Sequence, residues 1–196
     1  FAMESGIDGF EFLSCIPGSI GGGIRMNAGC YGSEIKDIIV SVQAMDFNGK
    51  VLTIPASKIK FKYRSTDLPK DLIFLSGTFQ GKVSKKDVIK KKITEMKNMK
   101  ELTQPQRVKT GGSTFKNPIK QTNKKVWELI SESINIKEAN TKFGDALISE
   151  KHCNFLVNKR KATPEDMKNL INFIKESVYK KTGVKLELEI ILTSSK

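Results

Sequence analysis

The chain has 196 residues, enough for one large or two small domains, and 38% of them are hydrophobic, which is adequate for a buried core. Its 34 lysines and arginines exceed its 21 acidic residues by 13, a balance that raises the question of a nucleic-acid partner. No run of about eighteen apolar residues occurs, and the first residues lack the basic flank and apolar stretch of a signal peptide, so we expect a globular cytoplasmic protein without membrane insertion.

A glycine-rich stretch lies near the start of the chain. Residues 16–29, "IPGSIGGGIRMNAG", hold five of the 15 glycines. They do not match a Walker loop. They do not match the dinucleotide fingerprint Gly-x-Gly-x-x-Gly either, because Gly21 and Gly23 fit its first two glycines but Met26 stands in place of the third. Backbone of this composition bends tightly and can lie flat against a planar or anionic ligand, beside the paired donor and acceptor of Asn27. Composition alone leaves a structural turn and a ligand loop equally open.

Two extended segments are expected after this stretch. Residues 37–54 contain two extended apolar runs joined at Asn48 and Gly49. This dipeptide favours a tight hairpin turn, because both of its positions accept positive φ. The apolar run over residues 72–79 predicts a further strand.

Two helices are predicted from their apolar spacing and their end signals. The first begins after Ser84, carries one apolar face opposite a lysine face, and ends before Gln104. The second begins at Thr163, has a proline in its first turn, and is stopped by Gly183. A closing strand, "VKLELEIIL", is expected over residues 184–192. The lysine-rich helix therefore separates a strand-rich part from a mixed α and β part.

The distribution of the basic residues argues against a nucleic-acid partner. Most are lysines spread along helices, as in residues 84–100, and no arginine cluster, aromatic-interleaved basic strand or zinc-finger spacing occurs. A solvated lysine face explains the charge better, although a positive field would also gather an anionic small substrate. The three cysteines lie far apart and the single histidine is His152, so neither a disulfide framework nor a metal site is indicated.

The order of residues in the glycine-rich stretch resembles a known family. Residues 10–32, "FEFLSCIPGSIGGGIRMNAGCYG", are similar to the flavin-contacting segment of the UDP-N-acetylenolpyruvoylglucosamine reductases, which are bacterial cell-wall enzymes. Three further matches follow in the family's order: "FKYRS" at residues 61–65, "GGSTFKNP" at residues 111–118, and "LISEKHCNFLVN" with "ATPEDMKNLI" and "GVKLELEI" after it. The resemblance covers essentially the whole chain and is to the compact subclass that lacks an extra loop.

The resemblance implies an α+β fold in two parts. Residues 1–85 would be the remainder of a PCMH-type FAD-binding domain, and residues 86–196 an α+β substrate-binding C-terminal domain. Because the match starts after the segment that supplies the family's FAD-diphosphate loop, we expect that segment to be absent. The residues implied to contact FAD are Pro17, Gly18, Ser19, Gly21, Gly22, Met26, Asn27 and Gly29.

The family's activity defines the chemistry that the resemblance implies. These oxidoreductases reduce the enolpyruvyl ether of UDP-N-acetylglucosamine to the lactyl ether, UDP-N-acetylmuramate, in peptidoglycan precursor synthesis. NADPH first reduces FAD, and the reduced flavin gives hydride to the vinyl carbon. The resulting carbanion is conjugated to a carboxylate, so the site needs a cationic or acidic group at the carboxylate and a proton donor at the other carbon.

Three residues match the family's catalytic positions. Arg64 matches the arginine that pairs with the substrate carboxylate, a role that suits a guanidinium fork. Ser113 matches the proton donor, and Glu189 matches the glutamate in the closing strand that acts as an acid or a proton relay. Without the resemblance, Arg64 would be interpreted as a surface cation, Ser113 as a turn residue and Glu189 as a solvated acid.

The same motifs imply further substrate contacts. Lys116 and Asn117 match the part associated with the diphosphate end, where an ammonium and an amide suit phosphate oxygens, and Tyr63 is another candidate substrate contact. His152 is interpreted as a structural or substrate-contacting residue rather than as the catalytic acid. We expect a monomer that uses FAD and NADPH and holds no metal. Another FAD-linked oxidoreductase on the same scaffold and a basic nucleic-acid-binding module remain as alternatives.

Overall fold

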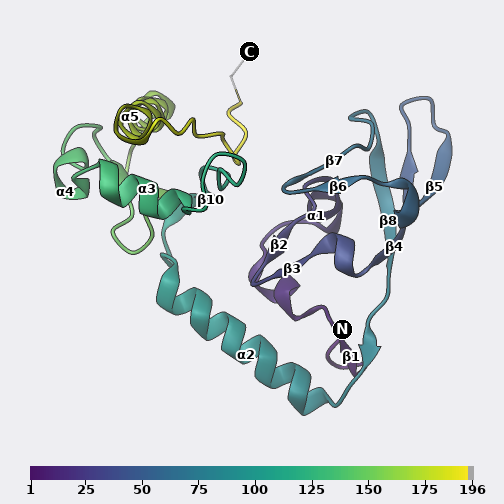
Figure 1. The fold of residues 1–196 in the computed structure, drawn as a ribbon. Coiled ribbons are helices and arrows are strands. Elements are labelled where there is room, and N and C mark those ends of the chain that lie inside the picture. Colours follow the sequence, from purple (N-terminus) through teal and green to yellow (C-terminus); the bar gives the residue numbers. More distant parts are fainter. Residues whose placement is uncertain (194–196) are drawn as a thin grey trace. The chain divides into compact units, whose positions relative to one another are not determined.

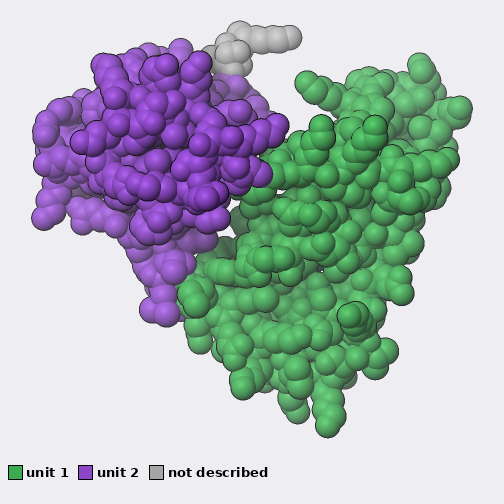
Figure 2. Space-filling view, in the orientation of Figure 1, with its two compact units in different colours: residues 1–100 green, residues 101–196 purple. Residues whose placement is uncertain are grey.

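Two compact units make up the chain in the computed structural model, which describes residues 1–193 (Figure 1). The units are Phe1–Lys100 and Glu101–Lys196, coloured green and purple in Figure 2. Each unit has its own hydrophobic core. The division falls within helix α2 (Lys86–Thr103), and side chains along this helix bind to the first unit.

The first unit is rich in short strands. Before α2, its elements are β1 (Ile7–Asp8), the 3-10 helix η1 (Glu11–Cys15), α1 (Ile20–Arg25), β2 (Gly29–Cys30), β3 (Ser33–Glu34), η2 (Ile35–Asp37), β4 (Ile39–Met45), β5 (Val51–Pro55), η3 (Ala56–Lys58), β6 (Phe61–Lys62), β7 (Ser65–Thr66), β8 (Ile73–Phe79) and β9 (Lys82–Val83). An antiparallel sheet in the order β5-β4-β8 forms the framework, and α1 packs against β8. The remaining strands form two-stranded pairs, β1 with β9, β2 with β3, and β6 with β7.

The predicted hairpin and the predicted strand after it are both confirmed. β4 and β5 pair antiparallel, and β8 pairs along the other edge of β4. The turn differs from the expected tight turn, because Gly49 has a φ of 83° but Asn48 does not have positive φ. Asp46 closes a longer loop instead, since its carboxylate accepts hydrogen bonds from the backbone N–H groups of Asn48 and Lys50.

Helix α2 is attached to the first unit by one buried side chain and two lysines. Ile89 is fully buried. Lys92 donates to the two carboxylate oxygens of Asp8 at 2.8 and 2.6 Å, and Lys100 donates to a backbone carbonyl oxygen of η1 at 2.8 Å. A hydrogen bond with Glu11 and the neighbouring Lys92 ammonium hold the pKa of Asp8 below its usual value, and Asp8 in turn raises the pKa of Lys92.

Replacing Lys92 by methionine is expected to lower the melting temperature of the first unit in a pH-dependent way. A carboxyl group with a depressed folded-state pKa contributes stability above its unfolded value, here 3.8 for Asp8, and loses that contribution as the pH falls through the folded-state pKa. The difference between the parent and Lys92→Met should therefore be present at neutral pH and close as the pH falls below about 4.

Thermal unfolding between acidic and neutral pH tests this expectation. Lys91→Met is the matched control, because Lys91 is an exposed neighbour on the same helix. Its melting temperature should follow that of the parent at every pH. A Lys92→Met difference of equal size at acidic and neutral pH would contradict the role given to the Asp8 pair.

The second unit is an antiparallel sheet with helices packed on it. Its elements are β10 (Lys109–Ser113), α3 (Val126–Ser133), α4 (Ile136–Ala139), β11 (Ala146–Ile148), β12 (Phe155–Asn158) and α5 (Pro164–Thr182). The strand order is β10-β12-β11, and α3 and α5 pack together. Val126, Ile130, Leu170 and Ile174 from these two helices belong to the core. The mixture of helices and sheets confirms the expected α+β fold.

The predicted start and stop signals of α5 are confirmed. Thr163 Oγ1 accepts a hydrogen bond from the Asp166 N–H at 3.1 Å, and the Asp166 carboxylate accepts one from the Thr163 N–H at 2.8 Å, which completes a capping box. The hydrogen bonds that the Asp166 carboxylate accepts from the backbone N–H and the hydroxyl of Thr163 lower the pKa of Asp166. Pro164 occupies the first turn, and Gly183 ends the helix with a left-handed φ of 73°. Local sequence signals therefore decide both ends of this helix.

The C-terminal segment is extended but does not form the expected strand. Residues 187–189 run beside residues 114–116 and make one isolated antiparallel bridge, between Phe115 and Leu188. Backbone hydrogen bonds of 2.9 and 2.8 Å flank this bridge. The pairing does not extend further, because Pro118 has no N–H to donate and β10 bulges near its end.

Neither a membrane-spanning helix nor a metal-ligand cluster occurs in the described part of the chain. Within residues 1–193, no helix combines the length and the apolar character needed to cross a bilayer. The same residues contain no group of three or more histidine, cysteine or acidic side chains placed to hold a metal ion. The three cysteines are free thiols, and burial raises the pKa of Cys30 to about 11, so that this thiol stays protonated.

Candidate active site

The glycine-rich stretch folds into a tight turn followed by the short helix α1. Pro17 and Gly18 are exposed, and Gly18 has a φ of 125°, which favours glycine, with open space where a Cβ would stand. Ser19 caps α1 by accepting a hydrogen bond from the Gly22 N–H at 3.1 Å. Gly21 faces an aromatic side chain of β8, from which a Cβ would be separated by 3.4 Å. The stretch is therefore a structural turn that also presents bare backbone.

Asn27 ties the end of this stretch to two hairpins. Met26 ends α1, and Asn27 follows with a φ of 42° and a fully buried side chain. The Asn27 Nδ2 group donates to Glu34 Oε2 at 3.0 Å and to the Lys62 carbonyl oxygen at 3.1 Å, and Oδ1 accepts from the Lys36 N–H at 3.0 Å. This side chain is thus engaged inside the protein, where it holds α1 to β2–β3 and β6–β7.

Arg64 lies beside the last glycine of the stretch. Tyr63 and Arg64 form the turn between β6 and β7, and Arg64 has a φ of 53°. Arg64 Nη2 donates to the Gly29 carbonyl oxygen at 2.8 Å, Nη1 is 3.9 Å from Glu34 Oε1, and the guanidinium carbon lies 4.8 Å from the centre of the Tyr63 ring. The predicted carboxylate-binding arginine is therefore a hydrogen-bonded neighbour of the predicted cofactor-binding residues.

Residues with strained backbone conformations cluster in the same region. Among the described residues, four that are not glycine have positive φ, and three of these, Asn27, Tyr31 and Arg64, lie in or next to the glycine-rich stretch. Such conformations cost about 1–3 kcal/mol each and persist where the surrounding structure holds them, often at functional sites. Their concentration here supports a functional site in the first unit.

Sequence reasoning missed two residues that organise this region. Glu34 accepts from the amide of Asn27 and forms an ion pair with Lys36 at 2.8 Å. Arg25 donates to three carbonyl oxygens of residues 68–72 at 2.7 to 3.1 Å. The acceptors of Arg25 are 43 to 47 residues away in the sequence, so no local pattern could have signalled these contacts.

In the second unit, Ser113 and Glu189 lie on neighbouring backbone segments. Ser113 is the last residue of β10, which pairs with β12 and bulges just before it. Thr114 follows with a buried side chain, and its carbonyl oxygen accepts a hydrogen bond from the Glu189 N–H at 2.9 Å. Ser113 and Glu189 are both half-buried. The structure thus places the backbone segments of the predicted proton donor and the predicted glutamate side by side, whereas Arg64 belongs to the first unit.

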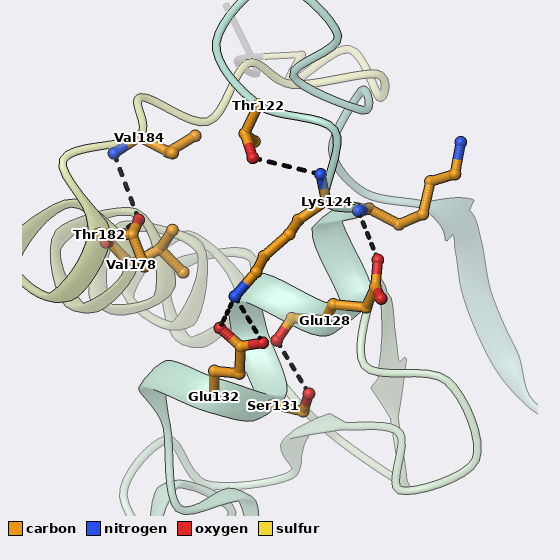
Figure 3. Close-up of polar contacts among 9 residues, drawn as sticks. Thr122, Lys124, Glu128, Ser131, Glu132, Val178, Thr182 and Val184 are labelled. Carbon is orange, nitrogen blue, oxygen red and sulfur yellow. Dashed lines mark hydrogen bonds and ion pairs between the residues drawn. The ribbon is translucent and has the colours of Figure 1, made fainter.

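The predicted diphosphate-binding residues follow directly in the chain. The Lys116 N–H donates to the C-terminal segment at 2.8 Å, and Asn117 Oδ1 accepts from the N–H of Val126, the first residue of α3, at 3.0 Å. Figure 3 shows the surroundings of α3, where the ammonium of Lys124, which precedes the helix, donates to both carboxylate oxygens of Glu132 in its last turn at 2.9 and 2.7 Å. Hydrogen bonds therefore fix the loop between β10 and α3 at several points.

His152 makes contacts inside the second unit. Its Nδ1 accepts a hydrogen bond from the Asn154 N–H at 3.3 Å, and its ring lies edge-on to Phe155 with 4.9 Å between the ring centres. Burial lowers the pKa of His152, which keeps the imidazole neutral at neutral pH. These contacts give the ring a structural role.

Comparisons with known proteins agree with this arrangement. Residues 104–193 match the profile of the UDP-N-acetylenolpyruvoylglucosamine reductase C-terminal domain, and residues 2–55 match that of an FAD binding domain. A UDP-N-acetylenolpyruvoylglucosamine reductase of Pelagibacter ubique is 59% identical over 190 residues, which cover 97% of this chain and 62% of the relative. One of Rickettsia massiliae is 46% identical over 190 residues, with the same coverage of 97% and 62%. The crystal structure of the reductase from Thermus caldophilus is 30% identical, with a TM-score of 0.78 over 96% of this chain and 65% of that one.

The two matched domains define a protein built from an FAD binding domain and a reductase C-terminal domain, with the glycine-rich stretch in the first and Ser113 and Glu189 in the second. The chain matches the UDP-N-acetylenolpyruvoylglucosamine reductase family along nearly its whole length, which confirms the resemblance of its motifs. It spans 62% of the length of its curated relatives, which is less than two thirds.

Proposed function

We propose that the protein is a flavoenzyme that uses NADPH to reduce UDP-N-acetylglucosamine enolpyruvate to UDP-N-acetylmuramate, and that it acts as a cytoplasmic monomer in peptidoglycan precursor synthesis. The observation that carries this proposal is the 2.8 Å hydrogen bond from Arg64 Nη2 to the Gly29 carbonyl oxygen. It joins the candidate for carboxylate binding to the stretch that matches the family's flavin contacts. The 59% identity with the Pelagibacter ubique reductase over 97% of the chain supports the same reaction.

The residues of the first unit fit a flavin at the glycine-rich stretch. Gly18 leaves open space where a side chain would stand, and Gly21 and Gly22 carry no side chain on the adjacent turn of α1. Exposed backbone at Pro17 and Gly18 is accessible to a flat ring. Bound FAD would accept hydride from NADPH and supply it to the vinyl carbon of the substrate.

The chain's own residues would manage the charge and the proton. Hydride addition leaves an electron pair on the carbon next to the substrate carboxylate. Arg64 would stabilise this anion by pairing with the carboxylate through two parallel hydrogen bonds. The Ser113 hydroxyl would donate its proton to that carbon, which completes the addition of a hydride and a proton across the double bond. Glu189, whose N–H donates to the carbonyl oxygen of the residue after Ser113, would return a proton to the serine oxygen.

Removing the Arg64 guanidinium is expected to impair use of the enolpyruvyl substrate. Arg64→Lys retains the charge but loses the paired donors, and Arg64→Ala loses both. Hydrogen bonds to charged groups are worth about 1.5–3 kcal/mol, so kcat/KM should fall by roughly 10- to 100-fold in Arg64→Ala and by less in Arg64→Lys. NADPH oxidation by the FAD-loaded protein, measured against the concentration of the enolpyruvyl sugar nucleotide, tests this.

Arg160→Ala is the control for loss of one positive charge, because Arg160 is an exposed arginine of the second unit. Flavin content is measured in each variant, since Arg64 also contacts Gly29. The proposed function fails if the FAD-loaded parent does not oxidise NADPH in response to the enolpyruvyl sugar nucleotide. The role of Arg64 fails if an active parent and Arg64→Ala have equal kcat/KM.

A further inference from the structure

Asn154 holds the backbone that lies between Ser113 and Glu189. Its side chain is only 5% exposed. Nδ2 donates to the Phe115 carbonyl oxygen at 2.8 Å, and Oδ1 accepts from the Phe115 N–H at 2.9 Å. The backbone carbonyl oxygen of Asn154 also accepts from the Thr114 N–H at 2.8 Å. Three hydrogen bonds from one residue therefore fix two consecutive residues of the loop.

The fixed residues connect the two predicted reacting groups. Ser113 directly precedes Thr114 and pairs in the sheet with the residue that follows Asn154. The Thr114 carbonyl oxygen accepts from the Glu189 N–H at 2.9 Å, and Phe115 forms the isolated bridge with the C-terminal segment. A shift of the backbone at residues 114 and 115 would therefore move the Ser113 hydroxyl and the Glu189 carboxyl relative to each other.

We propose that Asn154 is a positioning residue of the active site, whose side-chain amide sets the spacing between the Ser113 hydroxyl and the Glu189 carboxyl. This inference rests on the proposed function, which gives these two groups their part in proton transfer. Asn154 itself does not contact the reacting atoms in this scheme. A misplacement of about 1 Å can slow a reaction by about 100-fold. Loss of the two hydrogen bonds of the Asn154 amide, which we call the clamp, therefore slows proton delivery although both reacting groups remain.

The same unit contains a matched control for this role. Asn140 makes an equivalent pair of hydrogen bonds, because its Nδ2 donates to the Ile148 carbonyl oxygen at 3.0 Å and its Oδ1 accepts from the Ile148 N–H at 2.7 Å. Ile148 lies in β11, which is not adjacent to β10 in the sheet. Removing either amide deletes two side-chain hydrogen bonds to one backbone residue. A difference in reaction rate between the two variants therefore reflects where the lost hydrogen bonds lie and not a general loss of stability.

The experiment compares the parent with Asn154→Ala, Asn154→Asp and Asn140→Ala in the FAD-loaded protein. Aspartate keeps the size and the acceptor oxygen of asparagine, but as a carboxylate it cannot donate to the Phe115 carbonyl oxygen, so it tests the clamp in a variant with a mild change of shape. Four quantities are measured: the rate of flavin reduction by NADPH, the rate of flavin reoxidation by the enolpyruvyl sugar nucleotide, the KM for that substrate, and hydrogen exchange at backbone amides by NMR.

In Asn154→Ala, reoxidation by the substrate should slow by about 100-fold, while KM and the rate of reduction by NADPH stay close to those of the parent. The rate of reoxidation in Asn154→Asp should lie between those of the parent and Asn154→Ala. Amide exchange should become faster at Thr114, Phe115 and Glu189. Asn140→Ala should show faster exchange at Ile148 and an unchanged rate of reoxidation.

An equal loss of reoxidation in Asn154→Ala and Asn140→Ala would overturn the positioning role, as would unchanged exchange at Thr114, Phe115 and Glu189. If Asn154→Ala does not fold, Asn154→Asp decides by the same two criteria. A parent that is not reoxidised by the enolpyruvyl sugar nucleotide overturns the proposed function instead. The exchange data then still decide whether the Asn154 amide holds this backbone.

Discussion

Ser113→Ala is expected to reduce the rate of flavin reoxidation by the enolpyruvyl substrate by about 10²- to 10⁴-fold, which is the usual contribution of a positioned general acid. The bulge in β10 and Gly112, with a φ of 83°, turn the strand just before Ser113, an arrangement that re-aims a side chain at the end of a strand. Reduction of the flavin by NADPH should be unaffected, because that step needs no proton from the serine. Stopped-flow absorbance of the flavin separates the two steps.

Two variants make this prediction specific. Ser113→Cys keeps a proton donor at the same position and should recover part of the lost rate. Ser131→Ala removes a hydroxyl that donates to the Glu128 carbonyl oxygen on α3, and it should react at the parent's rate. The assignment of Ser113 as the proton donor is wrong if Ser113→Ala slows both steps equally or leaves reoxidation unchanged.

Gly29→Ala is expected to destabilise the first unit by about 1–3 kcal/mol, the usual cost of forcing an extra carbon into packed structure. A Cβ at this position would lie 2.4 Å from the Ser33 carbonyl oxygen and 2.7 Å from Glu34 Cγ. Both atoms belong to β3, which pairs with β2 through Gly29, so they cannot withdraw without opening the pair. The Gly29 carbonyl that accepts from Arg64 would be displaced as well, and flavin affinity should fall with stability.

Gly22→Ala provides the contrast within the same stretch. A Cβ there meets only Ser19 Oγ at 3.4 Å, and alanine is favoured over glycine inside a helix by roughly 0.8–1 kcal/mol. This variant should unfold at or above the temperature of the parent. Thermal unfolding checks both variants, with a shift of about 4–8 °C expected for each kcal/mol in a unit of this size. A Gly29→Ala protein as stable as Gly22→Ala would refute the packing argument.

The elements that could be predicted from the sequence are those with local signals. Helix α5 is decided by its own ends at Thr163 and Gly183, and the hairpin was predicted from its two apolar runs on either side of Asn48 and Gly49. The loop at Asp46 was not predicted, because a carboxylate competes there with the turn that the Asn48-Gly49 dipeptide favours. The closing strand was not formed beyond one bridge, because Pro118 has no N–H to donate and β10 bulges near its end, and neither effect can be recognised in the residues of the closing segment alone.

The candidate site depends on contacts that no local pattern records. Arg64 meets Gly29 across 35 residues, and Asn154 meets Phe115 across 39. Family resemblance could name Arg64 because its motif is recognisable, but the hydrogen bonds of Asn27 and Asn154 to distant backbone groups are visible only in the fold. Whether the glycine-rich stretch was a turn or a ligand surface was open for the same reason. In the structure it forms a turn and exposes bare backbone.

Carboxamide side chains hold four stretches of backbone in the second unit. Asn140, Asn154 and Asn158 each grip one stretch of backbone with both side-chain atoms, and Gln121 does the same at Lys185. Carboxamides neither gain nor lose a proton in water, so these four attachments should persist from mildly acidic to alkaline solution. An optimum in the pH dependence of kcat would then reflect the ionisation of the reacting groups and not the loss of these carboxamide hydrogen bonds.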